Sequence, residues 1–211
     1  MTDGTTMSNA IIESIASRHT TKYYDPAATL SDDQIRELVQ IGTTAPTSFH
    51  LQNWRFIAVR TAHAKSRLRP IAWNQPAITE AAVTFIMCGQ LAHSNVTAAR
   101  LASVVEAGIM PIEMVPDWVN AARILYDEHP VRQRDEAVRT ATFGAAAMIY
   151  PARSMGLGST PMIGFDDEAV HREFGLAQNE VPVMLLTVGA ERQGNWVQKP
   201  RRPLSDVLEF V

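Results

Sequence analysis

The chain has 211 residues, 46% of them hydrophobic and 19% charged, which is an ordinary globular composition with enough length for a sizeable core. Lys and Arg total 19 against 22 Asp and Glu, so the net charge of -3 gives no general reason to expect binding to nucleic acid or to an anionic membrane. Cys88 is the only cysteine, which excludes an intrachain disulfide.

The N-terminal part of the chain predicts two helices joined by an extended segment. Three isoleucines at helical spacing predict a helix over residues 8–17. Ser31 and Gln34 form a capping box that begins a second helix, which ends near Gly42. Residues 18–26 are expected to be extended, because the proline that closes this segment disfavours helix at the residue before it.

The middle of the chain predicts a polar loop over residues 45–54 and strands over 55–60 and 82–88. The second strand is continuously apolar and is therefore expected to be buried. Residues 94–130 are partly helical in pattern, and we expect prolines to interrupt them. These prolines are Pro111, Pro116 and Pro130.

The C-terminal part predicts a long helix over residues 135–155, which Pro151 should kink or shorten. A turn-rich loop follows over residues 156–166, and then a short helix with an aspartate cap that ends at Gly175. Residues 182–189 are a second buried strand. With no internal repeat and no linker, we expect one domain, 1–211, of mixed α and β layers rather than a doubly wound sheet.

Familiar catalytic and metal-binding patterns are missing from the sequence. The six histidines show no ligand spacing, so no metal site is predicted. There is no nucleophile elbow and no phosphate-binding P-loop, and the glycines of GLGSTP lack the dinucleotide-binding spacing. Cys88 lies in a predicted buried strand and is interpreted as packing. We therefore predict no catalytic side chain. The absence of a signal-peptide pattern and of a bilayer-spanning run leads us to expect a cytoplasmic location.

Four polar segments stand out instead. RHTTK near the N-terminus and KPRRP near the C-terminus supply cations that can pair with a phosphate, although each is also compatible with a solvated basic turn. TSFHLQN and AWNQP supply amides beside aromatic residues, which suits hydrogen bonding to a heterocycle. Together they indicate a phosphorylated heterocycle, and without a dinucleotide fingerprint they favour a mononucleotide such as FMN.

The ordered set of motifs resembles the nitroreductase family of FMN-dependent oxidoreductases, in particular its oxygen-insensitive NAD(P)H branch. The similarity covers residues 18–60, 74–88 and 135–189 and the tail motif KPRRPL. The resemblance implies an α+β fold, with a central mixed or antiparallel sheet flanked by helices. It also implies an intertwined homodimer with exchanged C-terminal segments and non-covalent FMN.

The family's motifs also imply which residues bind the cofactor. Arg18 to Lys22 match the phosphate motif, residues 46–54 match a loop that reaches the partner's flavin, and residues 161–164 match the segment under its central ring. His50, Asn53, Ala77 and Ile163 depart from the family pattern. The implied cofactor-binding residues are Arg18, His19, Thr20, Lys22, Pro46, Thr47, Ser48, His50, Gln52, Asn74, Pro161, Met162, Ile163, Gly164, Lys199 and Arg201.

Residues 94–130 fall outside the resemblance and are expected to be a variable insertion. They are either surface helices packed on the core or a flap over the flavin face. As a flap, they would place Met114 and Trp118 against the substrate, together with Phe49 from the polar loop.

The resemblance implies that hydride passes from NAD(P)H through flavin N5 to a nitroaromatic, a quinone or a similar electron-poor acceptor, with ping-pong kinetics. Two alternatives remain open at this point. One is a different reductase on the same fold, acting on enones, flavins or halogenated compounds. The other is a flavin-binding module without catalysis.

Overall fold

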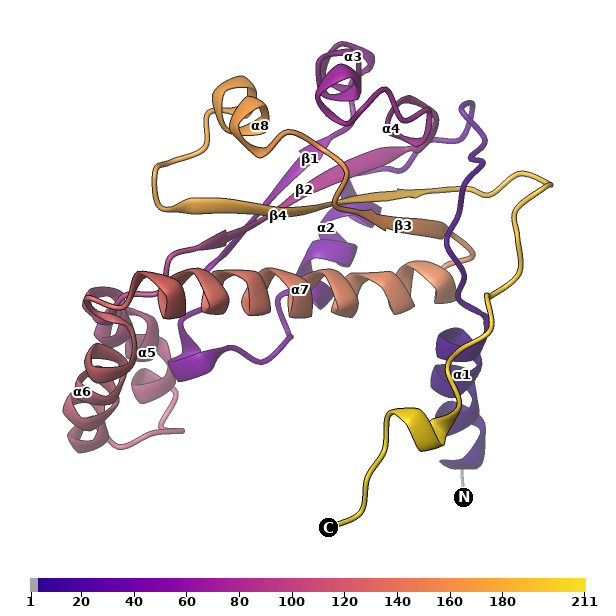
Figure 1. Cartoon of the computed structure of the whole chain (residues 1–211). Coiled ribbons are helices and arrows are strands. Elements are labelled where there is room, and N and C mark those ends of the chain that lie inside the picture. Colours follow the sequence, from indigo (N-terminus) through magenta and orange to yellow (C-terminus); the bar gives the residue numbers. More distant parts are fainter. Residues whose placement is uncertain (1–3) are drawn as a thin grey trace.

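A four-stranded antiparallel sheet lies at the centre of the computed structural model, which describes residues 4–211 (Figure 1). The strand order is β1-β2-β4-β3, so β2 and β4 are the central pair. The strands are β1 Trp54–Val59, β2 Val83–Gln90, β3 Gly158–Met162 and β4 Glu180–Gly189. The two central strands are the two apolar runs of the sequence, and with β1 all three predicted strands are confirmed.

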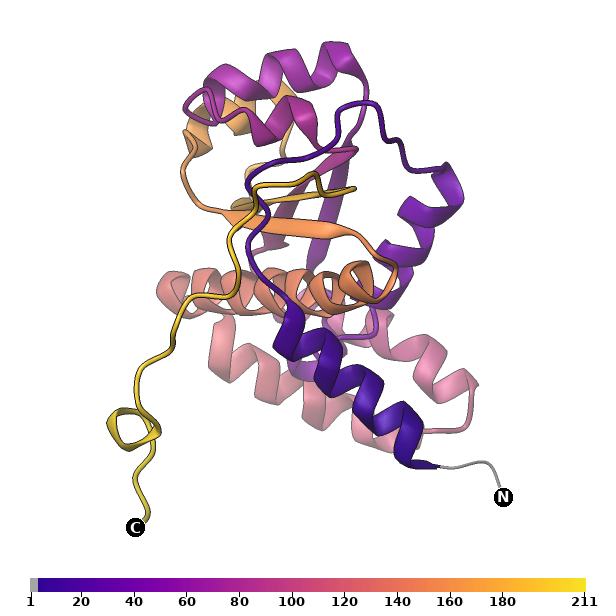
Figure 2. The same ribbon diagram turned by 90° about the vertical axis from the view of Figure 1, so that its right-hand side faces the viewer.

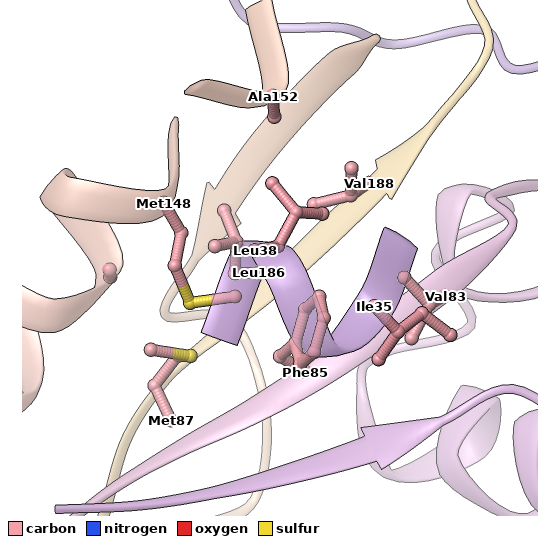
Figure 3. Packing of buried hydrophobic residues seen from close by; sticks show 10 residues of the cluster. Ile35, Leu38, Val83, Phe85, Met87, Met148, Ala152, Leu186 and Val188 are labelled. Carbon is pink, nitrogen blue, oxygen red and sulfur yellow. The ribbon is translucent and has the colours of Figure 1, made fainter. Parts of the chain in front are cut away.

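Helices α2 (Asp32–Gly42) and α7 (Pro130–Ser154) cover one face of the sheet. Phe85 and Met87 alternate along β2 toward this face, as the two-residue period of a strand requires. Figure 3 shows both side chains against Leu38 of α2 and Met148 of α7. The capping box of α2 is present, since the Ser31 and Gln34 side chains each bond the other's backbone amide.

The other face of the sheet carries α3 (Ala62–Ile71), α4 (Ala77–Glu80) and α8 (Asp167–Phe174). Ile86 and Cys88 of β2 point to this side, where they pack in a cluster with Val170 of α8. Burial raises the pKa of the Cys88 thiol to about 12, so this cysteine serves packing, as the sequence predicted.

Gly89 allows α7 to lie directly against β2. A Cβ on this glycine would overlap the carbonyl oxygen of Ala137, so no larger residue fits without moving the helix. The long helix is thereby fixed across the sheet. Different elements pack near the two ends of α7, and Figure 1 shows these ends on opposite sides of the molecule.

At one end of α7 lie α5 (Thr97–Glu106), α6 (Val115–Tyr126) and the short helical turn Ser48–His50 (Figure 1). Near the other end lie α1 (Gly4–Ser17) and the C-terminal tail, which Figure 2 shows extending away from the body. Further short turns are Ser94–Val96, Ile112–Met114 and Leu204–Asp206. None of the helices in residues 4–211 has the length and apolarity needed to cross a bilayer.

Two local predictions are wrong and a third is confirmed. The predicted loop 156–166 contains β3, an edge strand that tolerates Pro161 because its outer side is paired only by the bridge between Thr20 and Ser159. The expected interruption of residues 94–130 is confirmed, because α5, α6 and α7 are separate helices and Pro111 lies between the first two. Pro116 and Pro130 lie in the first turn of the helix that follows each break, where the N–H groups are unpaired in any case. Helix α7 begins at Pro130 and continues past Pro151 to Ser154, so the second proline removes one bond in the last turn without stopping the helix.

Candidate functional site

A cavity of about 400 Å³ lies where the two ends of the chain meet. Its walls come from the segment after α1, the start of α4, strand β3 and the tail after β4. Figures 1 and 2 both show the indigo N-terminal segment and the yellow tail running side by side here. The predicted site residues in its lining are Arg18, His19, Thr20, Lys22, Met162, Lys199 and Arg201.

The N-terminal segment is fixed against β3 and β4 by Tyr24, whose ring is fully buried. Its phenol bonds the hydroxyl of Thr187 at 2.9 Å and donates to the hydroxyl of Thr160 at 3.2 Å. Burial raises the pKa of Tyr24 to about 12, so the phenol stays neutral and acts as a structural anchor. The backbone amide of Thr21 also donates to the carbonyl of Ser159.

The side chain of Asn195 joins the N-terminal segment to the loop before the tail. Its Oδ1 accepts hydrogen bonds from the backbone amides of Lys22, at 2.7 Å, and Tyr23, at 2.9 Å. Its Nδ2 donates to the carbonyls of Tyr23 and Arg192. One amide side chain therefore sets the distance between the two segments that carry the cations.

Replacing Asn195 with Ala should loosen this junction. The backbone amides of Lys22 and Tyr23 lose their acceptor, so we expect their hydrogen exchange to accelerate on the order of tenfold. Gln193→Ala is the matched control, because Gln193 is exposed in the same loop and its side chain bonds nothing in the described chain. Unchanged exchange at both amides would show that Asn195 does not hold the segment.

Four cations surround the cavity, and none pairs with a carboxylate within the described part of the chain. They are Arg18, Lys22, Lys199 and Arg201. Lys22 and Lys199 instead lie over the ring of Trp196, with their Nζ atoms 5.4 and 5.5 Å from its centroid. A group of cations without carboxylate partners, held on two fixed segments, is suited to binding an anion.

His19 has a different role from the four cations. Its Nε2 lies 3.0 Å from Oε1 of Glu191, and the same oxygen accepts a bond from the Thr21 hydroxyl. Arg153 approaches the second carboxylate oxygen at 3.4 Å. The ring of His19 lines the cavity, but this network holds it in place.

Amide and apolar groups form the remaining walls. Gln75 donates to the carbonyl of Gly164 at 3.1 Å, while Ala77 and Met162 are buried beside it. Of residues 161–164 only Met162 lines the cavity. Pro161 and Ile163 are exposed, Gly164 packs under the ring of Trp73, and Asn74 is exposed in a left-handed conformation next to the lining.

The polar loop of residues 46–52 lies elsewhere, with Trp118 of α6, around a second cavity of about 470 Å³. The loop residues in its lining are Pro46, Thr47, Phe49, His50 and Gln52. Ser48 is outside the lining and accepts a bond from the Tyr126 phenol at 2.7 Å. A single subunit therefore does not bring the loop and the cation cavity together.

The loop is held in an unusual backbone shape. Phe49, His50 and Gln52 all have φ between 45° and 55°, a region that residues other than glycine rarely adopt. Phe49 meets the rings of Trp118 and Tyr126 edge to face, each at 6.1 Å between centroids. Such strain is characteristic of functional sites rather than of ordinary connections.

Asn53 anchors the end of this loop. Its side chain is buried, donates to the carbonyl of Gln90 at 2.6 Å and accepts from the Thr140 hydroxyl at 2.9 Å. Its departure from the family pattern thus has a structural role. Met114 lies in a third cavity, described below, which also contacts His50 and Trp118.

Sequence reasoning missed several residues of the first cavity. These are Tyr23, Glu80, Thr160, Trp196, Val197 and Gln198, together with the junction residue Asn195. Thr21, Gln75 and Pro76 lie within the polar segments RHTTK and AWNQP that the sequence singled out, without being named individually. Trp196 stands three residues before Lys199, so an aromatic residue beside the basic tail was the sequence signal that could have indicated its place in the site. Nothing in the sequence marked Asn195.

Comparison with known proteins agrees with the resemblance. The model of the nitroreductase family matches residues 15–190. The chain is 26% identical to YdgI of Bacillus subtilis, which is provisionally named an NAD(P)H nitroreductase, over 96% of this chain and 98% of that protein. It is 23% identical to the CLA biosynthesis enone reductase of Lactiplantibacillus plantarum, over 89% of this chain and 88% of that enzyme.

Among solved structures, a provisionally named nitroreductase of Exiguobacterium sibiricum in complex with FMN superimposes with a TM-score of 0.87. The identity is 24%, and the match covers 95% of this chain and 97% of that one. The α+β fold predicted from the sequence is therefore confirmed.

Proposed function

The chain belongs to the nitroreductase family of oxidoreductases, and on that premise we propose that it uses FMN and NAD(P)H to reduce nitroaromatics, quinones or similar electron-poor acceptors. The observation that carries the proposal is the cavity lined by four cations without carboxylate partners in the described chain. A phosphate group supplies the matching negative charge. The cavity volume of about 400 Å³ is also within the range of small-molecule sites.

The residues of the cavity fit FMN by their chemistry. Arg18 and Lys22 from one segment and Lys199 and Arg201 from the other would hold the phosphate, with the Thr20 hydroxyl as a further donor. Gln75 and Gln198 present amides suited to the polar edge of a flavin, and Met162 an apolar contact for its rings. Bound FMN would supply the hydride chemistry, accepting from NAD(P)H and delivering to the acceptor.

We further propose that the working unit is a homodimer. The polar loop 46–52 and the cation cavity are separate in one subunit, whereas a second copy can bring its loop to the first copy's cavity. Apolar side chains in α1 and in the tail also remain exposed, as expected of surfaces that a partner covers. They are Ile11, Ile12, Ile15, Leu204, Val207, Leu208 and Phe210.

Within this dimer, residues 94–130 would act as a flap on the single domain. Helices α5 and α6 project at one end of α7, and Trp118 packs edge to face on Phe49 of the polar loop. A loop that reaches the partner's flavin would bring Trp118 and Met114 with it. These side chains then form the wall against which a flat acceptor stacks.

Kinetics test the catalytic part of the proposal. Because one pocket serves NAD(P)H and acceptor in turn, initial rates with varied NAD(P)H and quinone should give parallel double-reciprocal lines. Anaerobic NAD(P)H should bleach the flavin absorption, and quinone should restore it. Retained flavin with no oxidation of NAD(P)H by any acceptor would favour the non-catalytic flavin-binding module.

A further inference from the structure

A third cavity, of about 460 Å³, lies between α5, α6 and the turn that joins them. Its walls are apolar except for one imidazole. Leu101 and Val104 come from α5, Ile109 and Met110 from the turn, and His50 is the polar contribution. Pro111, Met114 and Trp118 complete the lining. We call it the apolar cavity.

The apolar cavity adjoins the polar cavity of residues 43–52. His50 and Trp118 line both, so these two side chains form the wall between them. The wall is held from both sides. The Gln52 and His50 side chains are hydrogen-bonded, with 2.7 Å between their Nε2 atoms, and Trp118 packs on Phe49.

Side chains around the apolar cavity are adaptable and partly open to solvent. Ile109 is 77% exposed and Met114 45% exposed, although both are apolar. Methionine side chains adjust to ligands of varied shape. An exposed apolar wall next to a polar loop is the arrangement found where a small molecule binds with its apolar part inward.

We propose that the apolar cavity binds the hydrocarbon tail of the electron acceptor, and that His50 and Trp118 mark the point where the tail passes to the reducible head. The head would lie in the polar cavity beside Thr47 and Gln52, which in the dimer faces the partner's flavin. The acceptor class is therefore an amphipathic carbonyl compound, a quinone or enone with an alkyl chain, rather than a compact nitroaromatic. This inference rests on the proposed function for the position of the head.

Chain length is the variable that tests the inference. Alkyl-substituted para-benzoquinones, from methyl to decyl, are compared as acceptors, and alkylphenols of the same lengths are titrated by quenching of tryptophan fluorescence. We expect kcat/KM to rise, and the Kd of the phenols to fall, by about fourfold per methylene until the tail fills the cavity. Binding of the phenols requires no turnover.

Two substitutions locate the effect. Ile109→Ser removes an exposed apolar wall and should flatten the dependence on chain length, whereas Ile112→Ser, on a residue 65% exposed outside the cavity, should leave it unchanged. Val104→Trp should fill the cavity and abolish the dependence on chain length. Ile109 is exposed and Val104 is only partly buried, so neither substitution should disturb the core.

The possible failures are distinguishable. If the methyl quinone is reduced but neither series depends on chain length, the inference is overturned and the proposed function stands. If the phenols show the dependence and Ile109→Ser removes it, yet neither quinones nor nitroaromatics are reduced, the cavity assignment holds and the proposed function is wrong. A dependence that Ile112→Ser removes equally would also overturn the inference, because the tail would then bind elsewhere.

Discussion

Mixing Arg18→Ala subunits with Gln52→Ala subunits should restore activity that neither variant has alone. Arg18 lines the cation cavity and Gln52 lines the polar cavity. Each proposed site therefore combines Arg18 of one subunit with Gln52 of the other. A heterodimer then contains one site with both residues intact and one with neither. After free exchange, about half of the dimers are mixed and half of their sites work, so activity should return to about a quarter of wild type.

Arg18→Ala mixed with Arg201→Ala is the matched control. Both residues line the same cavity, so every site in that heterodimer carries one damaged contact and no recovery is expected. Subunit exchange is verified in both mixtures with differently tagged chains. Equal recovery in the two mixtures, or none in the first despite exchange, would mean that the two cavities do not form one site across the interface.

Removing Arg201 should weaken FMN binding strongly without unfolding the protein. Arg201 is exposed on the tail, so its loss does not disturb the core, while a charge-assisted phosphate contact contributes about 1.5–3 kcal/mol. Arg201→Ala should therefore raise the Kd for FMN by about 10- to 150-fold. Titration of the flavin-free variants measures this directly.

Arg202→Ala provides the comparison for Arg201→Ala. Arg202 is adjacent in the chain, but it does not line the cavity and it approaches Asp206 at 3.7 Å. We expect its loss to leave the Kd for FMN unchanged. If both substitutions weaken binding equally, the effect comes from the general charge of the tail and Arg201 has no specific phosphate contact.

Much of the fold could be predicted because the apolar patterns are local. The capping box at Ser31 and the continuous apolar run of β2 each specify their element within a few residues. Strand β3 could not be recognised, since a short edge strand containing Pro161 forms only when β4 is beside it. The prolines that start α6 and α7 were ambiguous, because a proline suits the first turn of a helix and disrupts its interior.

The site was partly predictable for a similar reason. Clustered cations such as Arg18 and Lys22 are visible in the sequence, and the structure places them with Lys199 and Arg201. Asn195 could not be found, because an isolated asparagine gains its role only when the loop containing it meets residues 22 and 23. The separation of the polar loop from the cation cavity likewise arises only in the fold, where the turn Ser48–His50 and the N-terminal segment lie near opposite ends of α7 (Figure 1).

Titration of flavin-free protein with FMN and with riboflavin tests the central claim most directly. The two ligands share the ring system and differ only in the phosphate that the four cations are proposed to hold. If they hold it, FMN should bind more tightly than riboflavin, on the order of a hundredfold or more. Equal affinity for the two, or no binding of either, would contradict the assignment of the cavity to a flavin phosphate.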